Sequence, residues 1–107
     1  MLCYRVEDNT GYGPYGMDDA SQEQIEMMDA HNVLPCADED FGGWDDDYRF
    51  ACMTLEQLKS WFGKYFRQLK GYHVGVYESK DVLVGNSGLQ IMFRKKTSKF
   101  VKRINIK

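Results

Sequence analysis

Apolar and polar residues alternate in several short stretches of the chain, and this period of two is typical of β-strands. The pattern predicts strands at residues 2–6, 48–52 and 72–78 and in both arms of a hairpin over 81–94. The hairpin turn is Gly85-Asn86-Ser87-Gly88, whose residue types favour tight turns. The last stretch, 95–107, predicts either one further strand, from the spacing of its apolar residues, or a frayed tail.

A helical period of three to four residues follows the second predicted strand. Thr54 and Gln57 have the spacing of a capping box, and Gly71 is placed to end the helix. The apolar positions on one face are Leu55, Leu58, Trp61, Phe62, Tyr65, Phe66 and Leu69. We expect a helix over 55–69 whose aromatic residues serve the core rather than a binding site, because burial of such rings stabilises a fold.

A thinner apolar face predicts a smaller, peripheral helix over 21–31, with Ser21 and Gln24 as its capping box. Residues 8–16 and 32–47 are expected to be loops because glycine, proline and acidic residues interrupt any period. These elements predict one α+β domain over residues 1–107. Its expected architecture is a twisted antiparallel sheet with the 55–69 helix packed on one face.

Charge divides the chain into an acidic and a basic half. Residues 1–53 contain thirteen acidic and two basic residues, whereas residues 54–107 contain three acidic and twelve basic residues. The acidic charge is concentrated in a predicted loop at 36–47, and the basic charge in a C-terminal segment at 94–107. Two interpretations stay open: the halves face and neutralise each other, or they form a dipolar surface that steers a charged partner.

Composition makes several classes of protein improbable. No apolar run has the length of about 18 residues that a membrane span needs, so we expect no membrane association. The N-terminus lacks the basic start and apolar stretch of a secretion signal. The three cysteines, Cys3, Cys36 and Cys52, have no paired spacing, which favours a reducing cytoplasm over a disulfide framework.

Two charged sets are the candidate partner-binding residues. They are Asp38, Asp40, Asp45, Asp46 and Asp47 in the acidic loop and Lys95, Lys96 and Lys99 in the basic segment. The acidic set is interpreted as a solvated loop, a loose divalent-cation site, or a surface that imitates nucleic acid toward a basic groove on another protein. The lysines suit phosphate contacts, although a sequence pI of 5.6 is low for a dedicated nucleic-acid binder.

The sequence predicts neither a metal site nor a cofactor. Counting from Asp38, the twelfth position of an EF-hand is Arg49 rather than glutamate. His31, Cys36, Cys52 and His73 lack the tight paired spacing of a zinc site. No glycine-rich nucleotide motif occurs. His31 is more typical of a helix end than of a catalyst.

Several segments resemble a group of small uncharacterised proteins of bacteriophages and prophages. The segments are "CYRVED", "GYGPY", "YRFACMTLEQLKSWF", "GYHVGVYES" and "GLQIMF". The matching residues are Tyr4, Arg5, Gly13, Pro14, Tyr15, His31, Pro35, Thr54, Leu55, Leu58, Trp61, Phe62, Gln90 and Phe93. The resemblance implies a phage or prophage origin and a setting in the host cytoplasm, and it implies no activity.

A weaker resemblance is to ADP-ribosyltransferases. Arg5 on the first strand and the segment "FACMTLEQL" resemble the start of that fold. A late catalytic glutamate, which would stabilise a cationic transition state, is replaced here by Gln90, with Glu78 as the nearest substitute. This resemblance implies a nucleotide-using enzyme with Arg5, Glu78 and Gln90 as candidate catalytic residues, and His31 completes the set of candidates.

The leading hypothesis is therefore a non-enzymatic phage accessory protein. It would bind and modulate a host protein through charged surfaces, as an anti-defence inhibitor does. The alternatives are the nucleotide-using enzyme and a nucleic-acid binder that acts through the basic C-terminal segment. The oligomeric state stays open.

Overall fold

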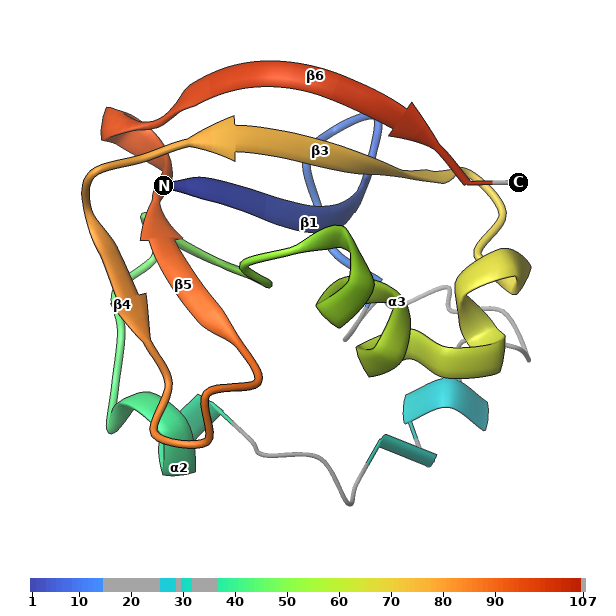
Figure 1. The fold of residues 1–107 in the computed structure, drawn as a ribbon, viewed down its shortest axis with the longest axis horizontal. Coiled ribbons are helices and arrows are strands. Elements are labelled where there is room, and N and C mark those ends of the chain that lie inside the picture. Colours follow the sequence, from blue (N-terminus) through green and yellow to red (C-terminus); the bar gives the residue numbers. More distant parts are fainter. Residues whose placement is uncertain (15–25, 29, 32–36, 107) are drawn as a thin grey trace.

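The computed structural model describes residues 1–14, 26–28, 30–31 and 37–106. Within them two small antiparallel sheets and one main helix form an α+β fold, as predicted (Figure 1). The expected single sheet is divided in two: one sheet has the order β1-β3-β6 and the other β2-β5-β4. The strands are β1 (Leu2–Asp8), β2 (Tyr48–Ala51), β3 (Tyr72–Glu78), β4 (Val82–Val84), β5 (Ile91–Arg94) and β6 (Lys99–Asn105).

Strand β3 is the centre of the first sheet. It pairs with β1, where Leu2 lies opposite Glu78, and with β6, where Val74 lies opposite Ile104. The basic segment therefore includes an ordered strand rather than a frayed tail. An isolated bridge joins the two sheets, because Tyr4 and Cys52 exchange backbone hydrogen bonds of 2.9 Å.

The two faces of the first sheet bury different side chains. One face packs against helix α3 (Leu55–Phe62) through Val6, Val74 and Val76, which meet Leu58 and Phe62. The opposite face meets the second sheet, where Cys3 and Tyr77 pack with three residues of that sheet: Ala51, Ile91 and Phe93. Side chains alternate between the two faces of a strand. In β1 and β3 the even-numbered residues therefore face α3, and the odd-numbered residues face the second sheet.

The main helix is shorter than predicted. Thr54 caps α3 as expected, since its hydroxyl oxygen accepts a hydrogen bond of 3.1 Å from the Gln57 amide. The α-helix ends at Phe62 because Gly63 adopts a φ of +57°, a conformation that residues with a side chain rarely adopt. A 3₁₀ helix, Gly63–Gln68, continues the chain, and Leu69 is buried after it.

The acidic region also differs from its prediction as irregular chain. A five-residue helix, α2 (Ala37–Phe41), lies within it. Its Asp40 carbonyl accepts a hydrogen bond of 3.0 Å from the Asn86 amide, which fixes α2 against the hairpin turn. For the predicted 21–31 helix, residues 26–28 are helical and Met27 is fully buried, while the rest, including Ser21 and Gln24, lies almost entirely outside the described residues.

Candidate functional site

A buried polar cluster occupies the face of the first sheet opposite α3. It consists of Arg5, Glu7, His73 and Tyr77, each no more than 9% exposed. The Glu7 carboxylate is at its centre: Oε1 lies 3.4 Å from Arg5 Nε, and Oε2 lies 3.5 Å from His73 Nε2. Tyr77 donates a hydrogen bond of 2.6 Å to Glu7 Oε2. Buried charges need such partners, because an isolated one is costly.

Strand register brings this cluster together. Arg5 lies opposite Gly75, and Glu7 lies opposite His73, so the odd-numbered residues of both strands share one face. Gly75 leaves room for the carboxylate, because a Cβ there would lie 2.5 Å from Glu7 Oε2. A larger residue at position 75 would therefore displace Glu7 from its partners.

The charges of the cluster are held within the chain. The Arg5 guanidinium donates hydrogen bonds to the carbonyls of Phe50 (3.0 Å) and Gly11 (3.2 Å). Burial lowers the pKa of Arg5, and the negative charge of Glu7 opposes that effect. Burial and the bond to Glu7 raise the pKa of Tyr77, so its hydroxyl remains a donor at neutral pH. This arrangement stabilises the sheet and leaves little of Arg5 accessible to a ligand.

The structure does not bring the candidate transferase residues together. Glu78 lies on the opposite face of β3 from the cluster, is exposed, and accepts a hydrogen bond of 3.0 Å from the Met1 amine. Gln90 is buried beside Asp40, in the hairpin. The His31 ring lies 5.8 Å from the rings of both Phe62 and Tyr65, and burial lowers the pKa of His31. Within the described residues, these three and Arg5 in the buried cluster therefore form no common pocket.

The Asp40 side chain holds the hairpin turn in place through hydrogen bonds. Its carboxylate accepts hydrogen bonds from the Ser87 amide (2.9 Å), the Ser87 hydroxyl (2.8 Å) and the Gln90 side-chain amide (2.8 Å). A Cβ on Gly85 would lie 2.6 Å from Asp40 Oδ2, so glycine permits this close approach. Burial alone would raise the pKa of Asp40, but the three hydrogen bonds outweigh it and hold that pKa below its ordinary value.

Stability should therefore depend on the ionisation of Asp40. A carboxyl group whose pKa is lowered by folding stabilises the protein above its ordinary pKa and loses that contribution as the pH falls through the folded-state value. We expect Asp40→Asn to lower the free energy of unfolding by about 1–3 kcal/mol at pH 7. The amide nitrogen of asparagine would replace a carboxylate oxygen and would point at the hydrogen-bond donors of Ser87 or Gln90. The difference in thermal midpoint between wild type and variant should narrow as the pH is lowered toward about 3.

Asp46→Asn is the matched control, because Asp46 is exposed and its side chain forms no hydrogen bond with the described residues. Melting curves followed by circular dichroism at several pH values would compare the three proteins. A difference between wild type and Asp40→Asn that stays constant with pH would contradict the assigned role of the ionised carboxylate.

The exposed acidic and basic sets adjoin each other. Arg94 Nη1 lies 3.3 Å from Asp45 Oδ2 and 3.5 Å from Asp47 Oδ2. The Asp47 carbonyl accepts a hydrogen bond of 2.9 Å from the Lys95 amide, and its carboxylate accepts one of 3.1 Å from the Lys96 amide. Residues from the acidic and the basic half of the chain therefore meet here, and Arg94 partly neutralises Asp45 and Asp47.

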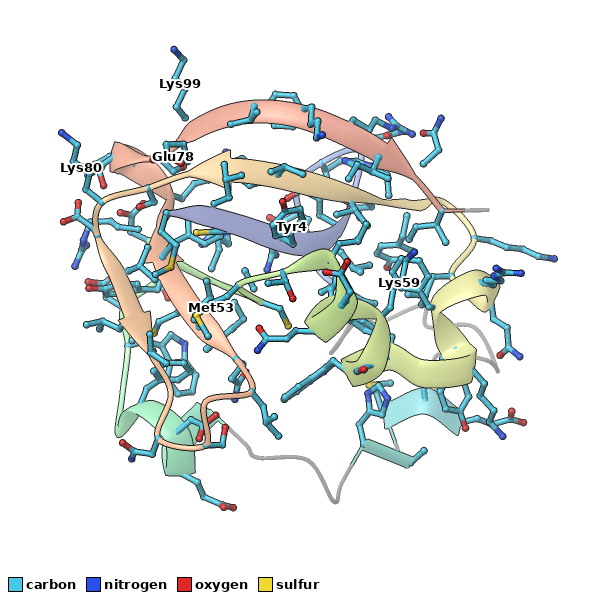
Figure 2. The ribbon with its side chains drawn as sticks, viewed as in Figure 1. Tyr4, Met53, Lys59, Glu78, Lys80 and Lys99 are labelled. Atoms are coloured by element: carbon cyan, nitrogen blue, oxygen red, sulfur yellow. The ribbon has the colours of Figure 1, made fainter. Side chains whose placement is uncertain are left out.

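The other candidate partner-binding residues are Lys95, Lys99, Asp38 and Asp40, and the structure places each in a different environment. The Lys95 ammonium lies 4.7 Å from the centre of the Tyr77 ring, and Lys99 begins β6 opposite Glu78. Figure 2 shows Lys99 and Lys80 projecting from the same end of the first sheet. Asp38 lies in α2, and its side chain is outside the described residues. Asp40 is buried, and of the other candidate aspartates with described side chains Asp45 and Asp46 are exposed and Asp47 is half-buried.

Sequence reasoning missed Glu7 and Tyr77. Glu7 follows Arg5 by two positions in a predicted strand, and this spacing places both side chains on one face. That signal was present, but the predicted strand stopped at residue 6. The partners on β3 were not predictable, because they depend on the register between two strands that are far apart in the chain.

Cys3 and Cys52 are the described cysteines, and both are buried free thiols; Cys36 lies outside the described residues. Burial raises the pKa of both Cys3 and Cys52 to about 11, which keeps these thiols protonated and unreactive at neutral pH. Among the described residues, no three side chains of His, Cys, Asp and Glu gather as metal ligands. Within the same residues, every helix is too short or too polar to cross a bilayer.

The fold defines a small two-sheet α+β protein whose buried carboxylates, Glu7 and Asp40, accept hydrogen bonds from within the chain. Comparison with protein families gives a match over residues 1–107 to the family described as Bacteriophage T4 Y00F protein. The chain belongs to this family, which confirms the expected resemblance to small phage proteins. No curated protein and no solved structure matches the chain.

Proposed function

We propose that this phage accessory protein binds a host protein in the host cytoplasm and is not an enzyme. Its contact surface is the mixed-charge surface, which we define as Asp45, Asp46, Asp47, Lys95, Lys96 and Lys99. The observation that carries the proposal is the set of bonds between Asp47 and the Lys95 and Lys96 amides. They hold charged groups from two distant segments in one fixed arrangement, and a preorganised surface loses less entropy on binding.

The way in which polar side chains are bonded within the chain supports a binding function over catalysis. Arg5, Glu7 and Asp40, which have the chemistry that catalysis uses, are buried and bonded within the chain. By contrast, the Asp45 side chain is 57% exposed although it pairs with Arg94. Exposed charges of this kind contribute little to stability but direct association with a partner of complementary charge. Inhibition of a host defence protein is one activity that such a surface would serve.

Two charge reversals would test the mixed-charge surface. Asp46→Lys and Lys96→Glu change exposed side chains and leave the structural bonds of Asp47 intact. Tagged full-length protein would capture partners from nuclease-treated host lysate at low and high salt, and the recovered partner would be titrated by calorimetry. We expect each reversal to weaken binding by at least about tenfold and to change its salt dependence. Lys70→Glu, outside this surface, is the matched control.

Binding that is unchanged in both variants would contradict the mixed-charge surface, and the absence of any captured protein would contradict the proposal of a host-protein partner. Deletion of 95–107 is unsuitable as a test, because it would remove β6 from the first sheet. Point variants are therefore needed to test the basic segment for any partner, nucleic acid included.

A further inference from the structure

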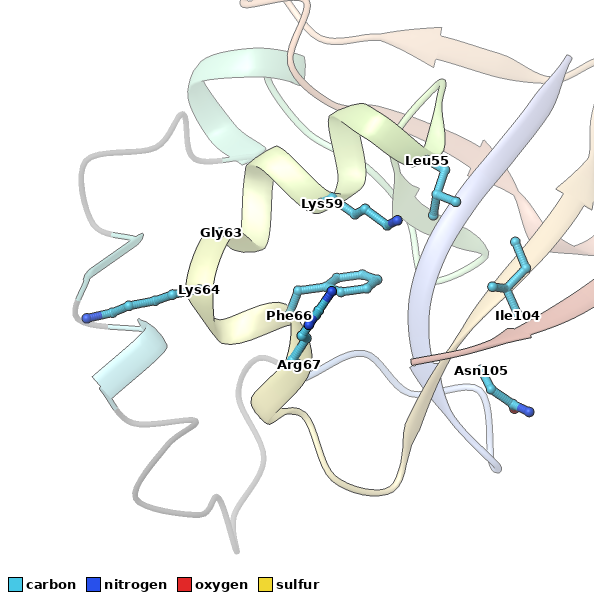
Figure 3. Close-up of a pocket in the computed structure, with 8 residues that line it drawn as sticks. All are labelled: Leu55, Lys59, Gly63, Lys64, Phe66, Arg67, Ile104 and Asn105. Carbon is cyan, nitrogen blue, oxygen red and sulfur yellow. The ribbon is translucent and has the colours of Figure 1, made fainter. Parts of the chain in front are cut away.

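A second surface, independent of the mixed-charge surface, is a groove between the main helix and the edge of the first sheet. Helix α3 packs over β1 and β3 and leaves the helix-side face of β6 partly uncovered. The resulting hollow has a volume of about 310 Å³ (Figure 3). The residues that line it are Leu55, Lys59, Gly63, Lys64, Phe66, Arg67, Ile104 and Asn105.

The turn after α3 assembles this groove. Gly63 ends the α-helix with its positive φ, and the 3₁₀ helix that follows redirects the chain. As a result, Lys59 from the last turn of α3 and Arg67 from the 3₁₀ helix border the same hollow. A continuous α-helix would have placed these residues, eight positions apart, more than 10 Å apart along its axis.

Among the described residues that line the groove, every charged side chain is positive. Lys59, Lys64 and Arg67 border it, and none of the described lining residues is acidic. Within the part of the chain that the structure describes, neither Lys59 nor Arg67 forms an ion pair. Lys102 lies opposite Val76, and alternation places it on the same face of β6 as Ile104. The groove therefore offers cations without internal counter-charges.

An aromatic ring lines the groove together with the cations. Phe66 is half-buried, and in Figure 3 its ring points from the 3₁₀ helix toward β1. Lys59 and Arg67 line the same hollow, whereas Lys64 points away from Phe66 in this view. Lys64 is instead 5.2 Å from the centre of the Tyr65 ring. The groove thus combines a planar apolar side chain with two positive charges.

We propose that this groove binds single-stranded nucleic acid, with one base on Phe66 and the adjacent phosphates at Lys59 and Arg67. Stacked bases and neutralised phosphates are the two contacts through which proteins bind single strands without sequence preference. A volume of about 310 Å³ suits one nucleotide. A duplex is disfavoured, because it keeps its bases stacked and away from Phe66.

The test uses the intact protein and a fluorescein-labelled oligothymidylate of about 12 nucleotides, a length within the range of known single-strand sites. Fluorescence anisotropy would be measured at several salt concentrations between about 50 and 200 mM. Because stacking accepts any base, this probe tests the groove without knowledge of a natural sequence. We expect binding that weakens with salt, and weaker binding to a duplex of the same length.

Three variants separate stacking from charge. Phe66→Leu keeps an apolar side chain but removes the ring, and we expect a loss of affinity of about 5- to 150-fold. The double variant Lys59→Gln with Arg67→Gln should reduce the slope of log affinity against log salt by about 1–1.5. Lys80→Gln is the matched control, because Figure 2 places Lys80 at the opposite side of the molecule from Lys59. It should bind as the wild type does.

Three results would overturn the proposal. The first is no binding of the oligonucleotide at the lowest salt. The second is equal affinity for single strand and duplex with no effect of Phe66→Leu, which would indicate attraction to any polyanion. The third is competition by polyglutamate, added at the same concentration of charge as the oligonucleotide, together with no effect of Phe66→Leu on binding. That result would assign the groove to an acidic protein segment. Thermal melting of each variant would confirm that it folds. Because Asp46 and Lys96 are not groove residues, this test and that of the host-protein surface fail independently.

Discussion

Replacement of Glu7 by alanine is expected to lower the free energy of unfolding by about 3–5 kcal/mol. The carboxylate is 6% exposed and is the negative charge next to Arg5, which is itself buried. Without Glu7, the Arg5 guanidinium keeps two backbone carbonyls as acceptors but loses its counter-charge, and the Tyr77 hydroxyl loses its acceptor. Urea denaturation followed by circular dichroism would measure the loss.

Two further variants distinguish a buried charge from a general loss of packing. Glu56→Gln, at an exposed glutamate in the first turn of α3, should change stability by less than about 1 kcal/mol. The double variant Glu7→Ala with Arg5→Leu should recover part of the loss, because it removes both buried charges. A double variant less stable than Glu7→Ala alone would contradict the interpretation that the unpaired Arg5 charge is the main cost.

Phe62→Ala is expected to destabilise the protein by about 3–5 kcal/mol, through the loss of buried area and the cavity that remains. Phe62 is 4% exposed, packs in the core between α3 and the first sheet, and contacts the His31 ring. Trp61, its neighbour, is only partly buried at the border of that core. We therefore expect Trp61→Ala to cost clearly less than Phe62→Ala.

Thermal and urea denaturation of both variants would measure this order. Lys64→Ala, on the adjacent 3₁₀ helix and exposed, is the control and should stay within about 0.5 kcal/mol of wild type. If Trp61→Ala proved the more destabilising of the two, the helix would be rotated relative to the sheet, with Trp61 rather than Phe62 facing the core.

The sequence was sufficient for features that depend on local periodicity. The Thr54 cap, the β3 strand and the 81–94 hairpin follow from short patterns that no distant contact overrides. It was insufficient where tertiary contacts decide. Helix α2 forms in an acidic stretch because Asp40 bonds to the hairpin, and the division into two sheets depends on which strands pair.

The candidate site shows the same limit. The sequence pointed to Arg5 as a site residue, yet its guanidinium is held by Glu7 on the same strand and by the Phe50 carbonyl on β2, a strand that local patterns do not connect with β1. The basic groove depends on the turn at Gly63, which interrupts an otherwise uniform helical pattern. A continuous helix over 55–69 was the simplest prediction from that pattern, and on it Lys59 and Arg67 would be more than about 10 Å apart along the helix axis.

The pairing of β1 with β3 also sets the order of events during synthesis. Strand β1 leaves the ribosome before β3, and Leu2 pairs with Glu78, so the partner of β1 is made only after α2, β2 and α3. At about 5–20 residues per second, β1 remains unpaired with β3 for roughly 4–15 seconds. During that interval Tyr4 and Val6 lack the β3 residues of the core in which they are packed in the folded protein. Completion of the first sheet is therefore a late step, and a nascent chain that stalls before residue 72 would expose an aggregation-prone strand.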